Sequence, residues 1–330
     1  MRMNRSLWAA FLFAGLLLLF VIPFLKPVHV YLQSMKATAL SGEHNHAEWK
    51  NDPLWVQIQS LAERVDQPAE NARIDPVWKA IPGYNGLVVD REVTYQLAKS
   101  RSSQPIQLIY QELPPQIDLK QLPPAPIYRG NPQKPMVGLM INVAWGEEHL
   151  PAMLEILREE QVKATFFLDG SWAKKNPEWV KAIDQQGHEI GNHAYSHPAM
   201  SKLNESEMER QISQTNQVIE QVIGNKPRYF APPSGDFNQQ VVEVAHRQGM
   251  LTILWTLDTV DWKKPAPELI LKRIVPEVSN GNLILMHPTS PTVQALKPMI
   301  RQIRSKKLLL GTVSDVLSPA RVDVVRLPEF

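Results

Sequence analysis

The sequence contains no cysteine, and this absence removes several kinds of chemistry at once. Disulfide bonds, thiol nucleophiles and cysteine-ligated zinc are excluded, so a metal ion would have to be held by histidine, aspartate or glutamate. A large excess of one charge is also missing, because 35 Lys and Arg nearly balance 33 Asp and Glu among 330 residues. Nucleic-acid binding depends on clustered positive charge, so we expect no nucleic-acid partner. A neutral sugar polymer can be bound without clustered positive charge.

Long apolar runs are scarce, and the single exception is at the amino terminus. Residues 7–25 carry no charge, and 19 residues in a helix reach about 28 Å, roughly the thickness of a bilayer core. Arg2 and Arg5 precede this run and favour a cytoplasmic amino end. We therefore expect residues 1–35 to anchor the protein in the membrane and the rest of the chain to lie outside the cytoplasm.

Two alternatives for this segment stay open. Ala37-Thr38-Ala39 has the form of a signal-peptidase site, and cleavage there would give a secreted protein, although the site is well beyond the apolar run. A buried core helix is disfavoured, because a helix that is apolar all round needs a larger protein to cover it.

With 44% apolar and 21% charged residues, the remainder has the composition of globular domains. A Pro-Gly-Tyr-Asn-Gly turn, short apolar runs and one helical pattern between residues 75 and 112 predict a small α+β module. Seven prolines between Pro114 and Pro135 predict a stiff linker. The predicted divisions are an anchor or signal segment (1–35), a polar stalk with a helix near 54–65 (36–74), the module (75–112), the linker (113–135), a main domain (136–320) and a tail (321–330).

From residue 136 onward, apolar strand-like runs alternate with helical patterns about seven times. Asn204 with Glu207 predicts a capped helix start, and Gly224 predicts its end. This alternation indicates an α/β fold with a parallel sheet, either an open doubly wound sheet or a closed (β/α) barrel.

Polar residues gather where the predicted strands end. In a barrel these positions meet at one mouth, where catalytic and binding residues are found. They are Asn142 after the first strand, His193 and His197 after the third, Pro233 and Ser234 after the fourth, Asp258, Asp261 and Trp262 after the fifth, and His287 after the sixth.

His193 and His197 are four residues apart, a spacing that suits one Zn²⁺, Co²⁺ or Ni²⁺ ion. The alternative is that both are solvated surface histidines. The polar residues at the other strand ends favour a metal site instead. His287 is either a capped core histidine or a general acid near the metal. Asp258 and Asp261 either cap the loop or orient a catalytic partner.

The ordered segments GLMINVAWG, KATFFLDG, GHEIGNHAYSHP, RYFAPPSG, WTLDTVDWKKP and LILMHPT resemble the NodB-homology polysaccharide deacetylases, carbohydrate esterase family 4. The resemblance covers residues 136–320 and is nearest to sporulation-associated members. It implies a distorted (β/α) barrel that removes N-acetyl groups from chitin-like or peptidoglycan glycans. Active members use a divalent metal held by one Asp and two His, an Asp base and a His acid.

Carried over to this chain, the resemblance assigns His193 and His197 to the metal and His287 to the acid. Asp261 falls on the family's aspartate after strand five, and Asn142 falls on the catalytic base. The expected substrate contacts are Trp145, Pro233, Ser234, Trp262 and Leu285.

Three family positions are changed. Asn142 and Val143 replace the Asp-Asp pair, and Ala231 replaces an arginine that pairs with the base. An amide cannot accept a proton near pH 7 and a valine cannot bind a cation, so we expect the metal to be weakly held or absent. The carboxylates that follow strands one and four closely enough to substitute as base are Glu147, Glu148 and Asp236.

Three functions therefore compete. The first is a membrane-anchored, extracytoplasmic deacetylase of peptidoglycan or a related glycan, with sporulation as its setting. The second is a catalytically silent cell-wall protein that keeps the barrel mouth as a sugar groove. The third is a metal-dependent hydrolase of another amide or ester. Residues 75–112 also resemble small peptidoglycan-binding modules, which would hold the protein against its glycan.

Overall fold

The computed structural model describes residues 51–101 and 104–322. The predicted membrane segment at residues 7–25 lies outside these ranges. Within them, every helix is too short or too polar to span a bilayer.

The first elements match the predicted helix and α+β module. They are α3 (Pro53–Val65), the antiparallel pair β1 (Arg73–Asp75) and β2 (Lys79–Ile81), and β3 (Gly86–Val89), α4 (Arg91–Ser100) and β4 (Tyr110–Leu113), with β3 antiparallel to β4. The apolar run IQLIY at residues 106–110 favours a strand, but β4 begins only at its last residue, Tyr110. The reason is local, because the amide of Ile109 donates to the Thr94 hydroxyl and its carbonyl accepts from Asp90 at the start of α4.

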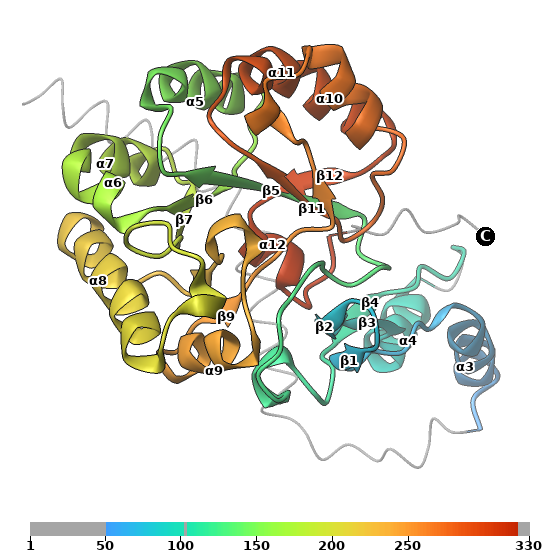
Figure 1. Cartoon of the computed structure of the whole chain (residues 1–330). Coiled ribbons are helices and arrows are strands. Elements are labelled where there is room, and N and C mark those ends of the chain that lie inside the picture. The colour runs from blue at the N-terminus through green and yellow to red at the C-terminus, as the bar shows by residue number, and fades with distance from the viewer. Residues whose placement is uncertain (1–50, 102–103, 323–330) are drawn as a thin grey trace, which may run out of the picture. The chain divides into compact units, whose positions relative to one another are not determined.

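A curled sheet of eight parallel strands forms the main domain (Figure 1). Its order is β10-β11-β5-β6-β7-β8-β9, and β12 also pairs with β5. The strands are β5 (Met136–Val143), β6 (Thr165–Leu168), β7 (Glu189–Asn192), β8 (Tyr229–Phe230), β9 (Leu251–Thr252), β10 (Leu257–Asp258), β11 (Leu283–Met286) and β12 (Leu309–Gly311). The predicted α/β fold with a distorted barrel is confirmed.

Helices follow the strands in the predicted alternation. They are α5 (Leu150–Glu159), α6 (Gly170–Lys175), α7 (Pro177–Gln185), α8 (Glu205–Ile223), α9 (Gln239–Arg247), α10 (Pro267–Ile274), α11 (Ser290–Ser305) and α12 (Val313–Leu317). The capping pair Asn204 and Glu207 is present at the start of α8. The helical pattern over residues 173–186 is divided between two helices, because Asn176 ends α6 and Pro177, which cannot donate a backbone hydrogen bond, begins α7.

The two edge strands of the sheet do not pair with each other, and the predicted linker pairs with one of these edges instead. β9 and β10 lie at opposite edges of the sheet. Ile127 fills part of the space, since its amide donates to the Thr252 carbonyl (2.9 Å) and its carbonyl accepts from the Leu254 amide (2.8 Å). The Ile127 side chain is fully buried. The proline-rich segment is therefore joined to the edge of the sheet and is not a free spacer.

β5 is buried along its whole length and separates two apolar clusters. Met136 and Met140 belong to the cluster inside the barrel. The alternate residues belong to the cluster between the sheet and the outer helices, and they are Val137, Leu139, Ile141 and Val143. Because successive side chains of a strand point to opposite faces, Asn142 shares the inner face with Met140.

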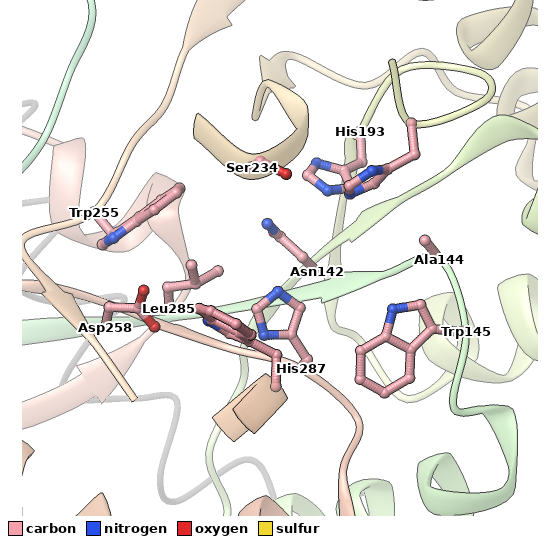
Figure 2. Close-up of a pocket in the computed structure, with 11 residues that line it drawn as sticks. Asn142, Ala144, Trp145, His193, Ser234, Trp255, Asp258, Leu285 and His287 are labelled. Carbon is pink, nitrogen blue, oxygen red and sulfur yellow. The ribbon is translucent and has the colours of Figure 1, made fainter. Parts of the chain in front are cut away.

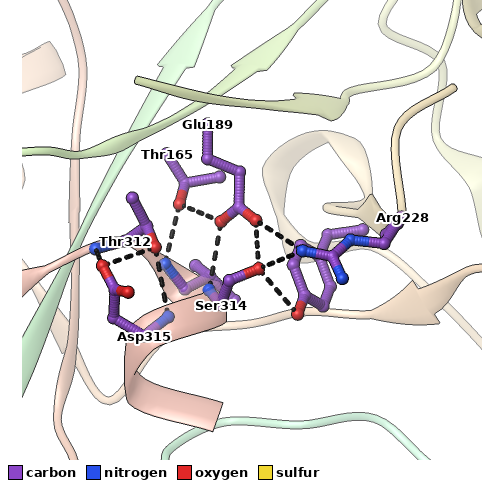
Figure 3. A network of polar contacts seen from close by, with 8 residues as sticks. Thr165, Glu189, Arg228, Thr312, Ser314 and Asp315 are labelled. Atoms are coloured by element: carbon purple, nitrogen blue, oxygen red, sulfur yellow. Dashed lines mark hydrogen bonds and ion pairs between the residues drawn. The ribbon is translucent and has the colours of Figure 1, made fainter. Parts of the chain in front are cut away.

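A polar network holds α12 at the amino ends of three strands (Figure 3). Glu189 accepts from the Thr165 hydroxyl (2.7 Å) and from the Ser314 amide (3.1 Å). Arg228 donates to the Ser314 hydroxyl (2.8 Å) and lies 3.7 Å from Glu189. This network occupies the end of the barrel opposite to the polar strand ends predicted to carry function.

Candidate functional site

A cavity of about 390 Å³ opens at the carboxyl ends of the strands (Figure 2). It is lined by residues from the loops after β5, β7, β8, β9, β10 and β11 and by residues near the carboxyl ends of three strands, β5, β10 and β11. These residues are Asn142, Ala144, Trp145, His193, His197, Ser234, Trp255, Asp258, Trp262, Leu285 and His287. The sequence-predicted residues from five loops are thus brought together.

His193 and His197 lie side by side, with ring centroids 5.2 Å apart. The Nδ1 atom of His193 lies 2.8 Å from the Ala231 carbonyl, which can only accept, so Nδ1 carries the proton and Nε2 keeps a lone pair. Burial, reinforced by the neighbouring His197, lowers the pKa of His193 to about 3. His193 is therefore neutral at pH 7.

His287 is held by a fully buried carboxylate. Asp261 accepts from Nδ1 of His287 (2.8 Å), from its backbone amide (2.6 Å) and from the Thr292 hydroxyl. Asp261 does not line the cavity, and it acts on the site by orienting His287. With Nδ1 occupied, Nε2 is the atom of His287 that is left for a ligand, as the predicted acid role requires.

Three indole rings line the cavity with this histidine. Trp145 stacks on His287 with ring centroids 6.1 Å apart and planes 5° from parallel. Trp145 and Trp262 remain 44% and 51% exposed, and the ammonium of Lys263 lies over the Trp262 ring, 4.9 Å from its centroid. Trp255 completes the set and was not predicted, although the apolar run that ends in Leu254-Trp255 pointed to a strand end facing the mouth.

A glycine sets the position of Trp145. Gly146 has φ +85°, and a Cβ atom built on it would lie 2.2 Å from the Pro288 carbonyl oxygen. Only glycine fits this turn without displacing the backbone next to His287.

Strained backbone is concentrated around the same cavity. Ala194, His197, Ser234 and Val260 all have φ between +53° and +60°, a region that side chains other than glycine rarely adopt. Such strain gathers at functional sites, where surrounding contacts hold it in place. Its position supports a binding or catalytic role for the mouth.

Asn142 lies on the floor of the cavity and is only 3% exposed. Its Oδ1 atom has no hydrogen-bond donor among the described residues. Position 231, where family members carry an arginine, is a buried alanine whose carbonyl contacts His193.

The structure corrects two predicted positions. Val143 was expected at the mouth beside the histidines, but it is fully buried in the apolar cluster between the sheet and the outer helices. The alternation of side chains along β5 turns it away from Asn142. Pro233 was expected to contact substrate, but it is buried and does not line the cavity.

The three carboxylates considered as replacement bases lie outside the cavity. Glu147 accepts from the Trp172 indole (3.2 Å), and Glu148 lies 3.6 Å from His149. Asp236 accepts from the amide and the hydroxyl of Ser201 (both 2.8 Å). Asp258 does line the cavity, and one of its oxygens caps the turn by accepting from the Val260 amide (2.7 Å).

The donors present do not match the metal site that the family implies. His193 and His197 line the cavity, but position 143 supplies a buried isopropyl group instead of a carboxylate. In the part of the chain that the structure describes, three His, Asp or Glu side chains never come together as a metal site would need. The residues therefore do not fit a tightly held ion.

Comparisons with known proteins agree with this geometry. A family model for polysaccharide deacetylases matches residues 129–253. The uncharacterised protein YlxY of Bacillus subtilis is 44% identical over 94% of this chain and 97% of its own length. A peptidoglycan-N-acetylglucosamine deacetylase of Bacillus cereus is 32% identical over 51% of this chain and 82% of its own length.

Among solved structures, a carbohydrate esterase family 4 pseudoenzyme from Bacillus anthracis is similar, with a TM-score of 0.76 and 45% identity over 83% of this chain and 98% of that one. A mutant of that pseudoenzyme with restored enzymatic activity has the same TM-score and 44% identity, over 82% and 100% of the two chains.

Proposed function

This chain belongs to the polysaccharide deacetylase family, carbohydrate esterase family 4, and on that premise we propose that it binds a peptidoglycan-type glycan at the barrel mouth with little or no deacetylation. One observation carries the proposal. The base position holds an amide, Asn142, and the metal-ligand position holds Val143, whose side chain packs in the core. General-base catalysis alone is worth about 10² to 10⁴-fold in rate.

The parts of the site that bind a sugar are retained. Trp145 and Trp262 are about half exposed at the cavity, and sugar rings present apolar faces that pack on aromatic rings. The similarity to a peptidoglycan deacetylase supports a peptidoglycan-type ligand, and the similarity to a pseudoenzyme supports loss of turnover.

A slow deacetylase is the second candidate. The pair of His287 and Asp261 keeps the geometry of a general acid and its orienting carboxylate. Residual hydrolysis of N-acetyl groups would rest on this pair and on His193 and His197.

Glycan binding is tested with the purified protein and an oligosaccharide of N-acetylglucosamine, by calorimetry and tryptophan fluorescence. We expect Trp145→Ala and Trp262→Ala each to weaken binding about tenfold, because each removes a stacking face. Trp78→Ala is the matched control, since Trp78 packs on Tyr128 and does not line the cavity. Unchanged binding in both mouth variants, or no binding by the natural protein, would refute the proposal.

We also propose that the folded part lies outside the cytoplasm, because residues 7–25 are uncharged and follow two arginines. Protease added to intact cells with a permeable wall should then digest the chain beyond Lys36, while a cytoplasmic marker stays intact. Protection of residues 136–330 under these conditions would contradict the exported location. Residues 75–112 stay a predicted wall-binding module, and sporulation stays a predicted setting.

A further inference from the structure

The cavity at the mouth has an unusual balance of charge. Of its eleven lining residues, none is a lysine or an arginine, and one, Asp258, is a carboxylate. A second carboxylate, Asp261, is buried directly behind His287. The arginine that family members place at position 231 is absent from this chain. The lining groups thus include one carboxylate and no cation, and a cation beside them, Lys263, is held over the Trp262 ring with its ammonium 4.9 Å from the ring centroid.

Three side chains of the cavity can offer an acceptor to a ligand. Asp258 has one oxygen outside its turn-capping bond, and Nε2 of His193 keeps its lone pair because Nδ1 donates to Ala231. The side chain of Asn142 is 3% exposed, and its Oδ1 atom accepts no hydrogen bond from the described residues. Its side chain projects toward Ser234 and His193 (Figure 2), and a half-turn of the amide would present this oxygen to a ligand without breaking a described hydrogen bond.

The chemistry of the two possible sugars differs at this point. An N-acetylglucosamine residue offers one N–H and a carbonyl, which needs a donor. A glucosamine residue with a free amine offers an ammonium with three N–H donors and a positive charge. Indole faces such as those of Trp145, Trp255 and Trp262 also attract a cation.

We propose that the cavity recognises a glycan that has already lost N-acetyl groups, by holding the free ammonium of a hexosamine between Asp258, Asn142 and the tryptophan faces. This inference rests on the proposed glycan binding and specifies its ligand. The reaction that must supply such a ligand is N-deacetylation of a hexosamine polymer, the reaction of active members of the family. The protein would then bind the product of the deacetylation that active family members catalyse.

The test compares two tetrasaccharides of equal length, one of glucosamine and one of N-acetylglucosamine, with the full-length protein in calorimetry. We expect the glucosamine tetramer to bind at least about tenfold more tightly. Asp258→Asn should remove most of this preference, and the amide oxygen that remains can still cap the turn at Val260. Glu148→Gln is the matched control, because it makes the same charge change at an exposed carboxylate outside the cavity.

The outcomes are distinct. Equal or tighter binding of the N-acetylated tetramer would overturn this inference and leave glycan binding intact. A preference for the amine that survives in Asp258→Asn would also overturn it, since the attraction would then come from other surface carboxylates. Failure to bind either tetramer would reject both this inference and the proposed function.

Discussion

Release of acetate from an N-acetylglucosamine polymer is expected to rise about 100-fold or more over the natural protein in a variant with Asn142→Asp, Val143→Asp and Ala231→Arg. The first change supplies a carboxylate that can act as base beside His193. The second supplies a carboxylate as the third ligand of a divalent metal if the end of β5 turns it toward His193 and His197, and the third supplies a cation to pair with the new base. The rate is measured with added Zn²⁺ or Co²⁺.

The control is the same triple variant with His287→Ala. Among the described residues, His287 alone is held by a buried carboxylate at the mouth and can protonate the leaving amine, so its loss should abolish the gain. If the natural protein already turns over as fast as the triple variant, Asn142 belongs to a different working mechanism.

Val143→Asp alone is expected to lower the free energy of unfolding by about 3 kcal/mol or more, because it places an unpaired carboxylate in the apolar cluster between sheet and helices. The loss is measured by denaturant titration without metal. Zn²⁺ should recover part of it if the strand end can turn the carboxylate toward His193 and His197.

Val143→Ala is the matched control, with a loss of about 2 kcal/mol from the removed methyl groups and the space they leave. Val143→Asp that is no less stable than Val143→Ala would mean that the side chain at this position reaches water, contrary to the packing described above. It would also make the metal-ligand position easier to restore than we expect.

Much of the main domain could be predicted from sequence. The regular alternation of apolar runs and helical patterns, with the ordered motifs, was enough to place His193, His197, Asn142 and His287 at one mouth. Each follows a strand, and parallel strands end at the same edge. The orienting contact between Asp261 and His287 joins residues 26 positions apart, and the resemblance to a family supplied that aspartate.

The predictions that failed have physical causes that the order of residues along the chain does not reveal. At the end of β5, adjacent side chains point to opposite faces, so a motif of two residues does not guarantee two groups at the mouth. Val143 was misplaced for this reason. Trp255 was missed because it lies in the chain segment between β9 and β10, where the backbone crosses from one edge of the sheet to the other.

The bond between Ile127 and the edge of β9 has a practical consequence for dissecting the protein. A fragment beginning at Met136 would leave the Thr252 carbonyl and the Leu254 amide without the partners that Ile127 provides. It would also uncover the apolar surface around Ile253, with which Ile127 pairs. An open edge of this kind invites strands of other copies to pair with it. Truncation at the proline-rich segment would thus produce a self-associating protein, and the minimal soluble unit should retain that segment.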